Sequence, residues 1–112
     1  MMISIVTPTF NSMRTLDDYM RAVLIQEYPH EKMEMIFADG GSNDGTLERL
    51  KEYSENCDIP IYVYNNPLRT AEAGKAVAVR KSKGDIVCLL DSDNIIPDGH
   101  WISRMMKPFE EN

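Results

Sequence analysis

Short apolar segments alternate with amphipathic segments along the whole sequence, and this alternation constrains the fold more than any other feature. Apolar and β-branched runs bounded by turn residues predict strands, whereas apolar residues that recur every three or four positions predict helices. Four strand and helix units in a row predict an α/β fold with three α/β/α layers and a mostly parallel sheet joined by right-handed crossovers. The predicted strands are residues 3–6, 35–38, 61–64 and 86–90.

Prolines, glycines and capping residues predict where these elements begin and end. Pro8 closes the first strand, and Pro60 with the tyrosines after it suits an edge strand. Residues 86–90 are apolar without alternation, which is typical of a parallel strand covered on both faces. The helices are marked by Thr15 and Asp18 as an N-cap pair, by Leu47, Leu50 and Tyr53, by residues 72–83 ending at Gly84, and by Pro97 and Asp98 before a helix that Pro108 ends.

Composition limits the class of protein. The 112 residues, of which 43% are hydrophobic, fit a single domain over residues 1–112. A formal net charge of −6 gives no basic footprint for a phosphate backbone, so we expect no nucleic-acid partner. Cys57 and Cys88 lack the spacing of a zinc or redox site, which predicts reduced thiols. Neither a signal-peptide pattern nor an apolar run of roughly 18 residues occurs, so we expect a soluble, cytoplasmic chain.

Polar residues follow three of the four predicted strands. The first strand runs into Pro8, Thr9 and Asn11, the second into Asp39 and a glycine-rich turn, and the fourth into residues 91–94. In open α/β sheets, ligands bind in the crevice beyond the carboxyl ends of the strands. We therefore expect these residues to form one site.

Asp91 and Asp93 are two carboxylates separated by Ser92, directly after an apolar strand. Buried carboxylates need a cation or hydrogen bonds, and Mg²⁺ and Mn²⁺ commonly share one or two of them with substrate phosphates. The pair is therefore a candidate metal site for a diphosphate. The alternative is that Asp91 or Asp93 caps the turn that follows.

The other candidates have alternatives of the same kind. Asp39 can accept a hydrogen bond from a base or a ribose hydroxyl, or it can form an Asx-turn. Thr9 and Asn11 can equally be turn residues, and for Asp44 we expect a helix-capping role. Lys75 near the start of the third helix can reach phosphates over the crevice, or it can lie on a solvated helix face.

Four sequence pieces together resemble the donor-binding half of family 2 glycosyltransferases, which have the GT-A fold. The resemblance covers essentially the whole chain and implies the strand order 3-2-1-4. It also implies that Pro8, Thr9 and Asn11 line the nucleotide pocket and that Asp39 contacts the base, commonly uracil. Asp91, Ser92 and Asp93 would hold ribose, metal and diphosphate, with Asp93 as the direct metal ligand. The pieces are residues 4–11, 38–46, 83–85 and 90–94, in family order.

The implied function is transfer of a hexose from a nucleotide diphosphate sugar, such as a UDP-sugar, with Mn²⁺ or Mg²⁺, to a glycan, lipid or protein acceptor. Many family members carry Ala-Arg-Asn where this chain has Gly74, Lys75 and Ala76. The family's catalytic base lies in an acceptor-binding half, so we assign no base here and expect a donor-binding part of a longer enzyme, which can associate with membranes. We therefore expect the isolated chain to lack transfer activity. The alternative is a non-catalytic module that holds a sugar nucleotide or metal.

Two further expectations concern other enzyme classes and association with partners. A nucleotidyltransferase or phosphatase on a similar sheet is disfavoured because the expected motifs are absent. The residues around Lys75 lack the first glycine and the hydroxyl of a P-loop, and Ser42 stands where a phosphatase motif has its nucleophilic aspartate. The implied strand order leaves residues 86–90 at an open edge, and unpaired apolar edges promote association. We therefore expect further residues or a second copy of the chain to cover this edge.

Overall fold

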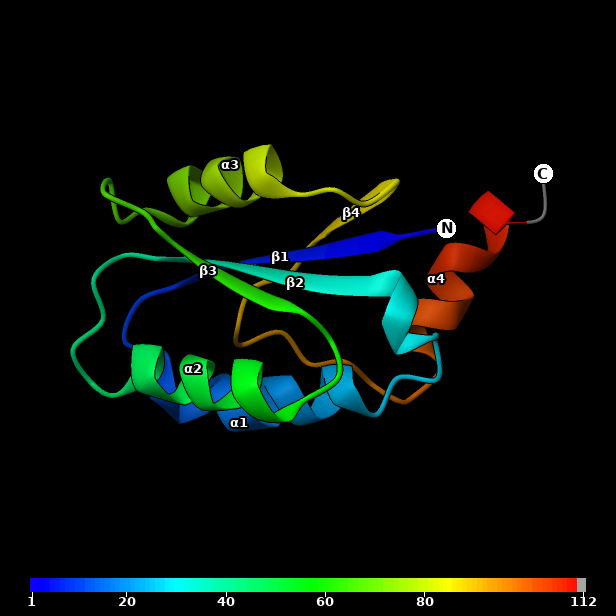
Figure 1. Cartoon of the computed structure of the whole chain (residues 1–112), viewed down its shortest axis with the longest axis horizontal. Coiled ribbons are helices and arrows are strands. Elements are labelled where there is room, and N and C mark those ends of the chain that lie inside the picture. Colours follow the sequence, from blue (N-terminus) through cyan, green and yellow to red (C-terminus); the bar gives the residue numbers. More distant parts are fainter. Residues whose placement is uncertain (111–112) are drawn as a thin grey trace.

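The computed structural model describes residues 1–110, which form three layers around a parallel four-stranded sheet (Figure 1). The strand order is β3-β2-β1-β4, and every neighbouring pair is parallel. Both the layered α/β fold and the predicted order 3-2-1-4 are confirmed. The strands are β1 (Ile3–Thr9), β2 (Met33–Asp39), β3 (Ile61–Asn65) and β4 (Ile86–Leu89); the helices are α1 (Met13–Leu24), α2 (Thr46–Asn56), α3 (Ala71–Lys81) and α4 (Trp101–Glu110), with a 3₁₀ turn η1 (His30–Lys32) before β2.

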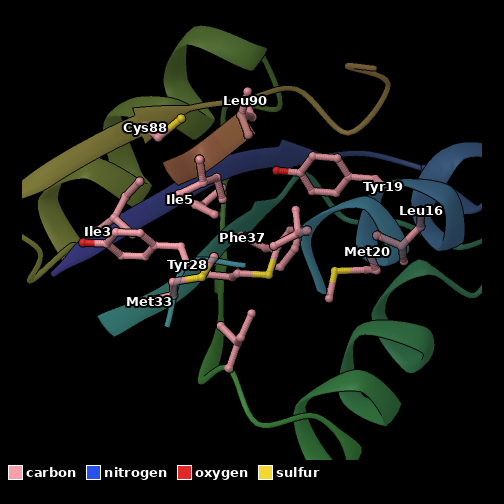
Figure 2. Packing of buried hydrophobic residues seen from close by; sticks show 14 of the residues in the cluster. Ile3, Ile5, Leu16, Tyr19, Met20, Tyr28, Met33, Phe37, Cys88 and Leu90 are labelled. Carbon is pink, nitrogen blue, oxygen red and sulfur yellow. The ribbon is translucent and has the colours of Figure 1, made fainter. Parts of the chain in front are cut away.

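The two faces of the sheet have separate cores because side chains alternate along a strand. Ile5 and Phe37 belong to the larger core, which packs against α1 and α4 (Figure 2). Val6 and Ile36 point the other way and pack against Ala78 of α3. In Figure 1, α3 lies on one side of the sheet and α1 and α2 lie on the other. The carboxyl ends of the strands are left open between these layers.

The expectation that Pro8 ends the first strand is wrong, because β1 continues through Pro8 to Thr9. The amide of Leu90 donates to the carbonyl of Val6, so the even-numbered residues of β1 direct their backbone groups toward β4. β4 ends at Leu89, level with Val6. Pro8 therefore lies beyond the ladder that its missing N–H would have joined, and the strand loses no hydrogen bond.

The first helix also begins earlier than predicted. α1 starts at Met13 after Ser12, so Thr15 and Asp18 are not its N-cap pair. Thr15 donates its hydroxyl to the carbonyl of Ser12, and Asp18 is an exposed partner of Arg21. The start is set by tertiary contacts, because the amides of Ser12 and Met13 donate to side chains at the beginning of α2.

The last helix begins and ends later than predicted. Asp98 lies in the turn before α4, where its carboxylate accepts the amide of His100. α4 runs to Glu110 with Pro108 inside it, so the prediction that Pro108 ends the helix is wrong. A proline removes one backbone donor. Burial of Ile102 and Met106 against the main core stabilises the helix in spite of that loss.

β4 is an edge strand, and only one of its faces is covered, so the expectation of a strand covered on both faces is wrong. Cys88 is buried in the main core, whereas Val87 and Leu89 are exposed on the side of α3. The physical reason is the position of α3, which packs mainly over β1 and β2. The edge position predicted for residues 61–64 is confirmed.

The remaining boundaries differ from the predicted ones by one to two residues, as is usual at element ends. None of the helices within residues 1–110 is long and apolar enough to cross a membrane.

Candidate functional site

A cavity of about 570 Å³ opens at the carboxyl ends of the strands, within the usual size range of small-molecule sites. It is bordered by the end of β1, the segment between β3 and α3, and the turn after β4. The structure thus brings together most of the residues predicted from strand ends. The predicted residues that line it are Pro8, Thr9, Asn11, Asp91, Ser92 and Asp93.

The strand order gives this cavity two different ends. Asn66 follows β3, Thr9 ends β1 and Asp91 follows β4, so the three lie in that order along the rim. Because three inter-strand spacings separate β3 from β4, the two ends are roughly 14 Å apart. An elongated ligand can therefore meet different chemistry at each end.

Asp39 is not among the residues that line this cavity, but it is hydrogen-bonded to Thr9, which does line it. Its carboxylate is buried and accepts four hydrogen bonds. The hydroxyls of Thr9 and Ser42 donate to Oδ1 at 2.7 and 2.6 Å, and the amides of Gly41 and Ser42 donate to Oδ2 at 3.0 and 2.8 Å. Four bonds fill the lone-pair positions of a carboxylate. Asp39 therefore forms the Asx-turn that the sequence offered as the alternative, and its contact with a nucleotide base stays a prediction.

Asn11 joins two loops at the rim. It has a positive φ of 48°, a conformation that asparagine tolerates better than most residues. Its amide donates to the hydroxyl of Ser42 at 2.8 Å, and its side-chain oxygen accepts the amide of Asn43 at 2.8 Å. Asn11 therefore fixes the loop after β1 to the loop after β2 and also lines the cavity.

Asp44 holds the starts of two helices. Its carboxylate accepts the amide and hydroxyl of Thr46 in α2 and the amide of Met13 in α1. The hydrogen bond from Thr46 is the largest cause that lowers the pKa of this carboxyl. Asp44 is not itself an N-cap residue, because Gly45 caps α2 and Ser12 caps α1. Its carboxylate nevertheless accepts the first amide of each helix, so it holds both starts in place.

Asp91 and Asp93 both line the cavity at the β4 end. The turn between them and α4 is fixed by Asn94, whose side-chain oxygen accepts the amide of Asp91 at 2.6 Å. Within residues 1–110 no group of three or more acidic, histidine or cysteine side chains is close enough to hold a metal. Two carboxylates facing one cavity fit a divalent cation that takes its other ligands from phosphates and water.

Lys75 does not line the cavity in the described chain; it supports one of these carboxylates instead. Its ammonium lies 3.2 Å from Oδ1 of Asp91, and both side chains are partly exposed. Lys75 is therefore not simply a solvated residue on a helix face, because its ammonium group pairs with Asp91. The contact ties α3 to the turn after β4 and offsets one of the two negative charges.

The surroundings of Gly74 explain the first position of the departure from Ala-Arg-Asn noted in the sequence. A Cβ at this position would lie 2.8 Å from Cβ of Pro8 and 2.9 Å from Nδ2 of Asn66. α3 therefore packs directly on two cavity residues, and any larger side chain here would displace one of them.

Sequence reasoning missed several residues of the lining. Phe10 lies between two predicted residues, and Asn66 follows the third strand, so the strand-end argument applied to every strand would have found both. Arg14 and Arg69 add positive charge, and no sequence pattern marked them. The Arg69 guanidinium lies 5.8 Å from the centre of the Phe10 ring, within cation–π range.

The sequence profile of the family described as glycosyl transferase family 2 matches residues 4–112. The chain belongs to glycosyl transferase family 2. Its GT-A fold is confirmed by solved structures: the family member resembles Staphylococcus aureus TarS, crystallised with UDP-GlcNAc, with a TM-score of 0.86 at 23% identity over 99% of this chain and 32% of that one.

Two further matches bear on the site. Glucosyl-3-phosphoglycerate synthase of Mycobacterium tuberculosis, crystallised with Mn²⁺, UDP and glucosyl-3-phosphoglycerate, gives a TM-score of 0.67 at 25% identity over 96% of this chain and 39% of that one. The putative teichuronic acid biosynthesis glycosyltransferase TuaG of Bacillus subtilis is 35% identical over 94 residues, which are 83% of this chain and 36% of TuaG. This family 2 chain spans a third or less of the length of most of the curated relatives it matches, from 36% of TuaG down to 11% of Pasteurella multocida chondroitin synthase.

Proposed function

We propose that this chain is the donor-binding domain of a glycosyltransferase that transfers a sugar from a nucleoside diphosphate sugar, with a UDP-sugar as the first candidate. The observation that carries the proposal is the convergence of Thr9, Asp91 and Asp93 from two neighbouring strands at one cavity. Family membership and the UDP and Mn²⁺ present in the crystal structures of similar proteins support it.

The charges around the cavity suit a diphosphate with a bound cation. Asp91 and Asp93 would hold Mn²⁺ or Mg²⁺, with Asp93 as the direct ligand because Lys75 already pairs with Asp91. When bound, such a cation supplies positive charge against the negative charge that develops on a leaving diphosphate. Arg14 would orient phosphate oxygens by charge, and Lys75 would add positive charge from its position beside Asp91. Pro8, Thr9, Asn11 and Ser92 would shape the pocket around the nucleoside.

Calorimetric titration of UDP and UDP-sugars, with and without Mn²⁺, tests this function. We expect binding that depends on Mn²⁺, because an anionic donor and two carboxylates repel each other without a cation. Equal affinity in both conditions, or no binding in either, would overturn the proposal.

A pair of variants tests the assignment of the metal ligand. Asp93→Ala should abolish the dependence on Mn²⁺ while circular dichroism shows the fold intact. Asp58→Ala is the matched control, because Asp58 is exposed and pairs with His30, near the amino ends of the strands. An Asp93→Ala protein with the normal response to Mn²⁺ would show that another group is the ligand.

A second candidate function is a module that binds the donor without transferring its sugar. Of the acids that follow Asp93, Asp98 pairs with Arg104 and Glu110 lies near the amino group of Met1, while Glu111 falls outside the described residues. No described residue is therefore assigned as the catalytic base. Binding of UDP-sugar with Mn²⁺ but without hydrolysis or transfer would favour the module, and turnover would favour a complete hexosyltransferase.

We extend the proposal to the parent protein. Residues 1–112 would be the donor-binding domain of a longer cytoplasmic or membrane-associated enzyme, which fits the small share of its relatives' length that the chain spans. Its acceptor would be a glycan, a lipid or a protein.

The edge at residues 86–90 would pair with further residues or with a second copy of the chain. Val87 and Leu89 are exposed, and the ladder to β1 uses the even-numbered residues of β4, so Val87 and Leu89 direct their backbone groups outward. Light scattering after size exclusion tests self-association, and a monomer at all concentrations would refute it.

A further inference from the structure

Lys75 pairs with one of the two carboxylates that face the cavity. Its ammonium lies 3.2 Å from Oδ1 of Asp91. The carboxylate of Asp93 has no ion pair or hydrogen bond with any other residue of the described range 1–110. Before any ligand binds, Asp93 is therefore open to a cation, whereas Asp91 already has a positively charged partner.

The backbone on both sides of this contact is fixed. On α3, an added Cβ at Gly74 would lie 2.8 Å from Cβ of Pro8, so the helix sits directly against the end of β1. In the turn after β4, the amide of Asp91 donates to Oδ1 of Asn94 at 2.6 Å, and the amide of Asn94 donates to the carbonyl of Asp91 at 3.0 Å. The Lys75 side chain is 32% exposed and flexible, so its ammonium can leave Asp91 while the backbone stays in place.

The charge of Lys75 distinguishes a bare divalent cation from one that arrives with a diphosphate. If a bare cation took Asp91, the ammonium would lose its partner and would stand beside a second positive charge. Arg14 lines the same cavity and adds to that repulsion. A diphosphate brings negative oxygens together with the cation, and these give the displaced ammonium a new partner. Electrostatic repulsion therefore opposes the bare cation much more than the cation with its diphosphate.

We propose that Lys75 is an internal counter-ion that withholds Asp91 from a bare cation and releases it only when the diphosphate of the donor is present. Lys75 is thus a positioning residue, because it acts through Asp91. Since coupling between two ligands is reciprocal, Lys75 enlarges both the factor by which UDP tightens cation binding and the factor by which the cation tightens UDP binding. This inference rests on the proposed donor-binding function and deepens it by naming what controls entry of the cation.

The test measures Mn²⁺ binding to the full chain by the electron paramagnetic resonance signal of free Mn²⁺, first without nucleotide and then with saturating UDP. We expect Lys75→Gln to bind Mn²⁺ alone about five- to tenfold more tightly than the wild type, because the repulsion from a nearby ammonium is gone. The gain in Mn²⁺ affinity on adding UDP should be smaller in this variant. Lys75→Arg keeps the charge and should retain the wild-type affinity for Mn²⁺ alone.

Lys81→Gln is the matched control, because it removes the same charge from the exposed end of the same helix, about 9 Å along the axis from Lys75. At about 0.15 M salt the Debye length is about 8 Å, so this control should leave Mn²⁺ affinity unchanged.

The sign of the change separates this role of Lys75 from the others. If Lys75 only ties α3 to the turn, Lys75→Gln would free Asp91 to move and Mn²⁺ alone would bind more weakly. If Lys75 only contacts phosphate, Mn²⁺ alone would bind the variant and the wild type equally. Either result would overturn the inference while leaving donor binding intact. A wild-type chain that does not bind UDP with Mn²⁺ present would overturn both the inference and the proposed function.

Discussion

The substitution Asp39→Asn tests whether the buried Asp39 carboxylate stabilises the fold through its four hydrogen bonds. Asparagine has the same shape, but it has no charge and one of its two end groups is a donor. The two backbone amides that bind Oδ2 cannot turn away, so the asparagine oxygen must take their place. Its NH₂ group then faces the hydroxyls of Thr9 and Ser42, which must rotate to accept.

The magnitude follows from the number of bonds. Hydrogen bonds to a charged group contribute about 1 kcal/mol more than neutral ones, so four of them set a loss of roughly 4 kcal/mol as an upper limit. Relief from burying a charge offsets part of this loss. We expect Asp39→Asn to lower the free energy of unfolding by about 2 kcal/mol, which corresponds to a decrease of roughly 10 °C in Tm for a domain of this size.

Urea unfolding followed by circular dichroism measures this change, and Asp93→Asn is the control. Asp93 is exposed, so the same substitution there should change stability by less than about 0.5 kcal/mol. If Asp39→Asn is as stable as Asp93→Asn but no longer binds UDP, then the carboxylate is a ligand contact and the structural reasoning is wrong.

Three further measurements test other parts of the fold. Gly74→Ala should lower stability by about 1 kcal/mol in urea unfolding, because the close contacts of a Cβ outweigh the helix propensity of alanine; a more stable variant would show that α3 can shift. Burial raises the pKa of Cys88 to about 11, so roughly one in a thousand of its thiols is ionised at pH 8. A disulfide reagent should therefore label Cys57 first, and equal labelling rates for the two cysteines in the folded protein would contradict this. The hydrogen bond from Arg49 holds the pKa of Asp17 below its ordinary value of 3.8. The contribution of Asp17 to the free energy of unfolding is therefore complete above pH 3.8 and is lost as the pH falls through the folded-state pKa. Asp17→Asn should lower the free energy of unfolding by less than about 1 kcal/mol near pH 7 and not at all in strong acid. A difference in stability between variant and wild type that does not change with pH would refute the assignment.

Much of the architecture could be read from the sequence because it depends on local patterns. The β-branched run of residues 3–6 and the apolar run of residues 86–90 lie within real strands, and the helix predicted over residues 72–83 lies close to α3. Strand ends also placed Thr9 and the carboxylates Asp91 and Asp93 correctly at one cavity, because parallel strands share a rim.

The errors occur where contacts distant in sequence decide the outcome. Pro8 fits inside β1 because β4 ends beside it, and α1 begins at Met13 because Asp44 accepts its amide. Pro108 remains helical because the apolar face of α4 is buried. No local pattern contains this information.

The sequence by itself determined the order of strands and helices and the chemical character of the strand ends, since both follow from the periodicity and type of neighbouring residues. Only the tertiary structure decided how each polar group is used. Asp39 is saturated by hydrogen bonds, Lys75 is paired with Asp91, and the side-chain oxygen of Asn66 is left without a hydrogen-bond partner. The physical reason is that hydrogen-bond satisfaction depends on which donors and acceptors the folded chain brings within about 3 Å of one another.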